Sequence, residues 1–118
     1  MLVIEGRALY RGGLEPLALG IERGRIVRIA KTLAGEETRD YGERLLLPGA
    51  VDPHVHFREP GMTAKEDFRS GTTAAAVGGV TTVVDMPNTD PPVTSPGAYK
   101  EKLQRVRAKA NVNFGLYG

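Results

Sequence analysis

The chain contains no cysteine, and this absence excludes two kinds of structure. Without cysteine, neither a disulfide framework nor a thiolate-ligated metal site can form. A metal centre would have to use imidazole and carboxylate ligands instead.

Long apolar runs and a leader sequence are also missing. No apolar run approaches the roughly 20 residues that a membrane-spanning helix needs. The first four residues, 1–4, are followed by Glu5, with neither a basic start nor a sustained apolar core, which is unlike a secretory signal peptide. We therefore expect a cytoplasmic protein without a membrane partner.

A strong excess of charge of one sign is also missing. The 118 residues include 16 basic and 14 acidic side chains, which gives a net charge of +2, and the basic residues are dispersed. A nucleic-acid partner is not expected, because such proteins carry clustered lysine and arginine. Hydrophobic residues make up 41% of the chain, which favours a folded core over disorder.

The only two histidines, His54 and His56, are separated by one residue and followed by Arg58. Successive side chains of a strand point to opposite faces, so both imidazoles would share one face with Asp52. Two neighbouring imidazoles favour metal ligation over the alternative of two polar residues at a strand end. Catalytic zinc usually takes three protein ligands, so further ligands would be carboxylates or lie outside these residues.

Short strands separated by glycine turns are predicted before residue 45, over 2–4, 17–21 and 25–29. Gly24 is expected at a turn position that needs positive φ. Residues 31–43 are polar and predict a loop. We interpret this part as scaffold without chemistry.

Strands and helices alternate after residue 45. The predicted elements are, in order, a strand over 45–56, a helix over 64–77, a strand over 80–85, a helix from residue 96 and a strand over 111–117. Thr63 and Glu66 match a capping box for the first helix, and Ser95 with Pro96 predicts the start of the second. The alternation predicts a parallel sheet of right-handed βαβ units. Three strands are too few for an eight-stranded barrel, so we expect part of a larger fold.

Polar side chains follow the ends of two predicted strands, which meet at one edge of a parallel sheet. His54, His56 and Arg58 lie at or just beyond the end of the first strand, and Asp85 and Asn88 lie at the end of the second. The guanidinium of Arg58 suits a carboxylate, and the Asn88 amide can both donate and accept. Together they suggest metal-assisted formation or hydrolysis of a carbonyl bond in a small anionic substrate.

Each of these residues also has a simpler interpretation. Arg58 could form a surface salt bridge with Glu59 or Glu66, and such exposed pairs are common and weak. Asn88 could be a turn residue. Asp85 is expected to orient its neighbours rather than bind the metal.

Five segments of the chain closely resemble the start of the dihydroorotases, a family of the amidohydrolase superfamily. They read PGAVDPHVHFREPG, KEDF, GTTAAA, GGVTT and DMPNT, at residues 48–61, 65–68, 71–76, 78–82 and 85–89. The resemblance implies an α/β fold that comprises the first βα units of a TIM-type (β/α)8 barrel, preceded by part of a small β-sandwich domain. We therefore expect residues 1–47 to belong to the sandwich and residues 48–118 to the incomplete barrel.

The resemblance also implies a function and its residues. The family uses a zinc centre of one or two ions to interconvert N-carbamoyl-L-aspartate and dihydroorotate in pyrimidine biosynthesis. His54 and His56 match its first two metal ligands. Arg58 and Asn88 match the residues that hold the substrate carboxylate, and His56 also borders the substrate. Whether the protein forms a homo-oligomer is left open by the sequence.

The chain departs from the family in what it lacks. The family's bridging carboxylated lysine, two more histidines and catalytic aspartate come from later strands, and none lies within these 118 residues. Neither Lys65 nor Lys100 stands at the end of a predicted strand, so neither is assigned the bridging role. We expect no catalytic residue here and no activity from this chain alone.

Two alternatives remain. Related cyclic amidohydrolases that open dihydropyrimidines, hydantoins or allantoin share the His-x-His and Gly-Gly-x-Thr-Thr features, although the HFREPG and MPNT segments favour a dihydroorotase. A non-catalytic, truncated homologue that acts as a scaffold is the other, and the presence of both histidines argues against it.

Overall fold

The computed structural model describes all 118 residues, which divide into two compact units, Met1–Pro48 and Gly49–Gly118. None of the helices is both long and apolar enough to cross a membrane.

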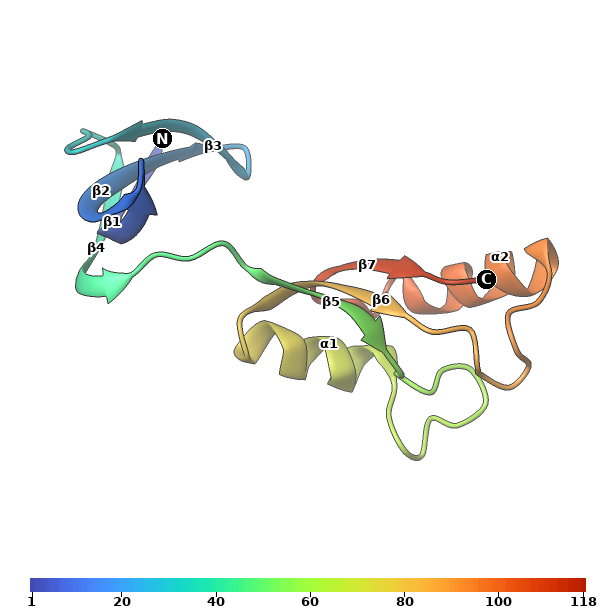
Figure 1. The fold of residues 1–118 in the computed structure, drawn as a ribbon. Helices are drawn as coiled ribbons and strands as arrows, with labels where there is room; N and C mark the ends of the chain where they lie inside the picture. The colour runs from blue at the N-terminus through green and yellow to red at the C-terminus, as the bar shows by residue number, and fades with distance from the viewer. The chain divides into compact units, whose positions relative to one another are not determined.

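The first unit is a four-stranded sheet (Figure 1). Its strands are β1 (Leu2–Tyr10), β2 (Gly13–Glu22), β3 (Arg25–Ala30) and β4 (Glu37–Leu45), in the spatial order β3-β2-β1-β4. The β1–β2 and β2–β3 pairs are antiparallel, whereas β1 and β4 are parallel. Its buried apolar residues are Val3, Leu17 and Ala18.

Two-residue turns join the antiparallel strands. In the β2–β3 turn, Arg23 has φ 50° and Gly24 has φ 72°. Positive φ at both central residues is the twist that suits a tight hairpin. The predicted positive φ of Gly24 is therefore confirmed.

The loop predicted over 31–43 is wrong from residue 37 onward, where β4 begins. Every residue of β4 is exposed, so the strand has no buried face and no alternation of apolar residues. Its backbone pairing with β1 holds it in place. A strand of this kind gives no periodic signal in the sequence.

The second unit is an α/β fold with a three-stranded parallel sheet, as the alternating elements predict (Figure 1). Its elements are β5 (Ala50–Val55), α1 (Phe68–Val77), β6 (Val80–Asp85), α2 (Pro96–Val106) and β7 (Asn113–Leu116). The strand predicted over 45–56 is in fact two, because β4 ends at Leu45 and β5 begins at Ala50. Pro48, which has no N–H to donate to a strand ladder, lies in the break.

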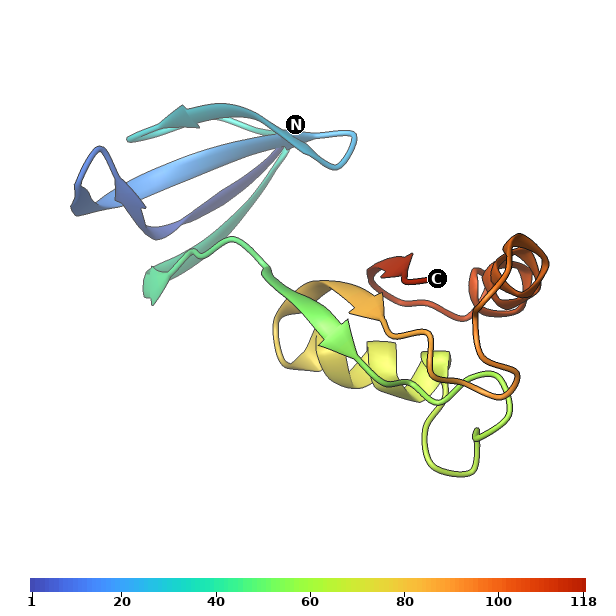
Figure 2. The ribbon, with the colours of Figure 1, turned by 45° about the vertical axis from the view of Figure 1, so that its right-hand side comes forward.

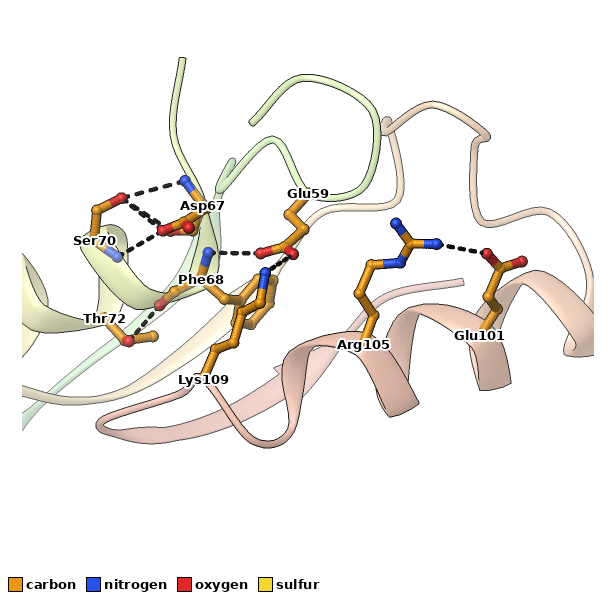
Figure 3. A network of polar contacts seen from close by, with 8 residues as sticks. All are labelled: Glu59, Asp67, Phe68, Ser70, Thr72, Glu101, Arg105 and Lys109. Atoms are coloured by element: carbon orange, nitrogen blue, oxygen red, sulfur yellow. Dashed lines mark hydrogen bonds and ion pairs between the residues drawn. The ribbon is translucent and has the colours of Figure 1, made fainter. Parts of the chain in front are cut away.

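Helix α1 begins later than predicted. Its N-cap is Asp67, whose carboxylate accepts from the Ser70 N–H at 2.8 Å, while the Ser70 hydroxyl accepts from the Asp67 N–H at 3.2 Å (Figure 3). The capping box predicted at Thr63 and Glu66 is wrong, because Asp67 and Ser70 satisfy these donors directly before the buried Phe68. These bonds from Ser70, the backbone N–H first, lower the pKa of Asp67.

Helix α2 begins as predicted, with Ser95 as N-cap and Pro96 as the first helical residue. The Ser95 hydroxyl accepts from the Ala98 N–H at 3.2 Å. Gly78 caps the end of α1, and Gly79, at φ 81°, completes the turn directly before β6.

Both helices pack on the same face of the sheet. Phe57, Phe68, Val83 and Val106 form one buried cluster, to which α1 contributes Phe68 and α2 contributes Val106. The Phe68 ring meets the Phe57 ring edge-on, with centroids 5.2 Å apart. Figure 2 shows α1 running along the sheet beneath β5 and β6. The opposite face of this sheet is left without a helix.

Candidate metal centre and its surroundings

Strand alternation separates the two histidines from the core. Val55, the last residue of β5, and Phe57 pack into the cluster beneath the helices. His54 and His56 have the opposite parity and therefore lie on the face without helices. His54 is exposed and His56 is half-buried, so both are accessible to a ligand.

The two imidazoles face each other. Their Nε2 atoms are 3.2 Å apart, with ring centroids at 5.1 Å. Two nitrogens each about 2.05 Å from one zinc ion would subtend an angle of about 103° at this separation, which is close to tetrahedral. The pair has the spacing and the donor chemistry for one cation.

This pair supplies only part of a coordination shell. The chain holds no group of three histidine, cysteine or acidic side chains that could enclose a metal ion. Asp52 shares the face of His54, but its carboxylate accepts from the His54 N–H at 3.1 Å. A catalytic zinc ion would need at least one further protein ligand.

Asn88 orients the second histidine. The His56 Nδ1 and Asn88 Oδ1 atoms are 2.8 Å apart. An amide oxygen only accepts, so Nδ1 of His56 carries the proton and donates. The Nε2 lone pair is then directed toward His54, as metal ligation requires. The Asn88 amide nitrogen keeps its own donors, and the side chain is exposed.

Arg58 is close to this group in sequence, but no hydrogen bond links it to the histidines or to Asn88. It takes part in none of the ion pairs of the chain: the predicted alternative partner Glu59 pairs with Lys109, and Glu66 accepts from the Ser70 hydroxyl. Its backbone has φ 60°, which is uncommon for a residue other than glycine. Sequence patterns give no signal for this conformation.

The sequence suggested Glu59 only as a surface partner of Arg58, whereas the structure shows that Glu59 anchors the loop that carries Arg58. Its side chain is 2% exposed, accepts from the Phe68 N–H at 3.0 Å and forms an ion pair with Lys109 (Figure 3). The loop also closes on itself, because the Met62 N–H donates to the Arg58 carbonyl at 2.9 Å.

Asp85 lies beneath the site at the end of β6. It is fully buried, and its Oδ1 accepts from the Phe57 N–H at 2.8 Å. Its Oδ2 is 2.6 Å from the ammonium of Lys102, which is 1% exposed. Lys102 was missed by sequence reasoning, because a lysine in an amphipathic helix predicts a solvated side chain.

Known proteins resemble this chain over nearly its whole length. A dihydroorotase from Methanosarcina mazei is 44% identical over 115 residues, which cover 95% of this chain and 25% of that protein. An allantoinase from Rubrobacter xylanophilus is 42% identical over 120 residues, which cover 99% of this chain and 26% of that protein. The chain thus spans about a quarter of the length of the curated relatives it matches.

A solved structure shows the same fold. The L-hydantoinase (dihydropyrimidinase) from Arthrobacter aurescens superposes with a TM-score of 0.90 at 30% identity, over 99% of this chain and 27% of that one. The family described as Dihydro-orotase-like matches residues 43–118, which include both histidines, Arg58 and Asn88. The chain therefore belongs to the dihydroorotase-like family of cyclic amidohydrolases.

Proposed function

We propose that this chain is the N-terminal part of a zinc-dependent dihydroorotase, a cytoplasmic enzyme that interconverts N-carbamoyl-L-aspartate and dihydroorotate in pyrimidine biosynthesis. The observation that carries the proposal is the facing of the His54 and His56 Nε2 atoms at 3.2 Å, beside Asn88. In this proposal β5, β6 and β7 are the first strands of a (β/α)8 barrel, and residues 1–47 belong to a small β-sandwich domain.

Each site residue has a distinct task in the proposed reaction. His54 and His56 would hold zinc, and Asn88 would keep the His56 ring in the orientation that presents Nε2. When bound, zinc polarises the carbonyl under attack and lowers the pKa of a water molecule. The proton acceptor and the remaining ligands are expected beyond residue 118.

The substrate's spare carboxylate would be held by Arg58 and Asn88. In ring closure the ureido nitrogen forms an amide bond with one carboxylate of N-carbamoyl-L-aspartate and water leaves. The other carboxylate remains charged throughout. Arg58 has no acidic partner within the chain, so its guanidinium is free to form the charge-assisted pair.

A neutral-ring amidohydrolase is the second candidate, because an allantoinase is 42% identical and a hydantoinase is 30% identical to this chain. Arg58 distinguishes the two. In the complete polypeptide that contains these residues, Arg58→Ala should lower kcat/KM for dihydroorotate by about 100-fold, the loss of roughly 2.7 kcal/mol of charged hydrogen bonding. Turnover of dihydrouracil or allantoin should be negligible before and after the change.

Two results would contradict this assignment. One is wild-type protein that turns over a neutral ring faster than dihydroorotate. The other is an Arg58→Ala variant whose dihydroorotate kinetics are unchanged. Arg58→Lys is the matched control, because it retains the charge but loses the planar fork of donors. Its kcat/KM for dihydroorotate should lie between those of wild type and Arg58→Ala.

The 118-residue chain by itself is proposed to be inactive, since two histidines do not complete a catalytic zinc site. Measurable conversion of dihydroorotate by the purified chain would refute this. The scaffold alternative predicts instead that the chain assembles stoichiometrically with a second polypeptide, which analytical ultracentrifugation of the mixture would detect.

A further inference from the structure

The peptide that joins His56 to Phe57 is fixed from below by a single buried acceptor. The Phe57 N–H donates to Asp85 Oδ1 at 2.8 Å, and Asp85 is 0% exposed. His56 is half-buried and its own side chain has only one hydrogen-bonded protein partner besides His54, which is Asn88. The direction of the His56 ring therefore depends on how firmly this peptide is held.

Lys102 contacts the second carboxylate oxygen of Asp85 and the residue that follows it. Its ammonium is 2.6 Å from Asp85 Oδ2 and donates to the Met86 carbonyl at 3.1 Å. Met86 in turn donates its N–H to the Val55 carbonyl at 2.9 Å. One buried lysine thus connects the end of β5, the end of β6 and the segment that leads to Asn88.

Stability alone does not account for this pair. Both side chains are 1% exposed. The free energy needed to remove two charges from water can exceed the free energy gained from their attraction. The ammonium also lies off the hydrogen-bonding direction of Oδ2, which has no hydrogen-bond donor of its own. A pair of apolar residues of the same volume would often stabilise a core equally well or better.

We propose that Asp85 and Lys102 are positioning residues for the metal pair: Asp85 fixes the His56–Phe57 peptide, and Lys102 fixes both Asp85 and the segment before Asn88. The two partners of the His56–Asn88 hydrogen bond are thereby set by one buried ion pair. The consequence for metal binding rests on the proposed function, whereas the consequence for the Phe57 amide does not.

Two double variants of the complete polypeptide isolate the acceptor. Asp85→Asn with Lys102→Met removes both charges but keeps an oxygen for the Phe57 N–H. Asp85→Leu with Lys102→Met removes both charges and the oxygen, at nearly the same volume. Arg105→Met, one turn along α2, removes a charge from an exposed pair and is the control.

Zinc affinity, measured by competition with a chelator, is the first readout. We expect the control to match wild type. The Asn/Met variant keeps the acceptor for the Phe57 N–H but loses the Lys102 bond to the Met86 carbonyl, so it should bind zinc about threefold more weakly. The Leu/Met variant should bind zinc at least tenfold more weakly, as outer-shell partners of metal ligands typically do when lost. Equal affinities of the two double variants would overturn the proposal.

Hydrogen exchange of the Phe57 amide in metal-free protein is the second readout, and it separates two kinds of failure. We expect this amide to exchange at least tenfold faster in the Leu/Met variant than in the Asn/Met variant. If wild-type protein binds no zinc but the exchange rates of the two variants differ as expected, the proposed function is refuted and the positioning role stands. Equal exchange rates in zinc-binding proteins would sink the positioning role alone.

A third variant covers the case in which the Leu/Met protein does not fold. Lys102→Met alone leaves the Asp85 carboxylate without its cation, and zinc affinity should fall by about tenfold. Adding Asp85→Asn should restore the affinity to within about threefold of wild type, because a neutral amide needs no counter-charge and only the Lys102 bond to the Met86 carbonyl stays lost. Lack of restoration would contradict the proposal.

Discussion

Glu59 and Lys109 form an ion pair across 50 residues of sequence, and the same carboxylate accepts from the Phe68 N–H at the start of α1. The loop that carries Arg58 is thereby tied to α1 and to the segment that follows α2. Glu59 is 2% exposed, whereas Lys109 is about one-third exposed. The carboxylate is therefore the member of the pair that depends on its partners.

Replacing Glu59 should destabilise the fold according to what the new side chain retains. Glu59→Ala leaves the Phe68 N–H and the Lys109 ammonium without a partner, and we expect a loss of about 3 kcal/mol in the free energy of unfolding. Glu59→Gln keeps an acceptor for the N–H and should lose less. Urea unfolding of the complete polypeptide measures both.

Glu101→Gln serves as the matched control, because Glu101 forms an exposed pair with Arg105 on α2 (Figure 3). It should change the free energy of unfolding by less than about 0.5 kcal/mol. A Glu59→Ala variant as stable as this control would show that the buried contacts contribute nothing.

Gly71 should not tolerate the substitution that usually favours a helix. A Cβ at Gly71 would lie 2.4 Å from the Phe57 ring, so Gly71→Ala should cost about 1–3 kcal/mol through overpacking. Gly97→Ala in α2 is the control, since its Cβ meets no atom nearer than 3.9 Å. That change should stabilise the protein by up to about 1 kcal/mol. Thermal unfolding of the two variants should therefore shift in opposite directions.

The cap of α1 should weaken in acid. The Ser70 N–H lowers the pKa of Asp67 below its ordinary value of 3.8, so the contribution of the cap to stability is complete above pH 3.8. It is lost as the pH falls through the lower pKa of the folded state. Exchange of the Ser70 amide should accelerate over this range in wild type. In Asp67→Asn the same amide should show no such step, and a step retained there would contradict the assignment.

Asn88 should show two separable tasks. Asn88→Asp keeps an oxygen for the His56 N–H, so zinc affinity should be preserved within about threefold. The added negative charge should repel the substrate carboxylate and raise KM for dihydroorotate by about tenfold or more. Asn88→Ala removes both functions, and zinc affinity should fall as well. Chelator competition and steady-state kinetics on the same samples separate the two effects, and identical behaviour of both variants would refute the division.

Local patterns predicted the elements whose signals lie within one turn or strand. The β-branched run of β6 and the Ser95–Pro96 start of α2 are examples. That His54 and His56 share one face followed from strand parity, and the structure shows their Nε2 atoms 3.2 Å apart on it. Strand β4 could not be predicted, because it is held by backbone bonds to β1 and buries no side chain.

Long-range partners were the other limit. Lys102 reaches Asp85 from a neighbouring element, and Glu59 meets Lys109 from far along the chain. Nothing in the local sequence distinguishes these lysines from solvated ones. The positive φ of Arg58 is likewise imposed by how its loop closes rather than by its own preference.

Alternate side chains at the end of β5 and just after it have different roles. Val55 and Phe57 serve the packing under the helices, and their neighbours His54 and His56 serve the open side. Substitutions on the open side change chemistry at little cost to folding, and substitutions beneath it do the reverse. A lineage can therefore acquire new ring specificities at one set of positions while the supporting architecture at the other set stays unaltered.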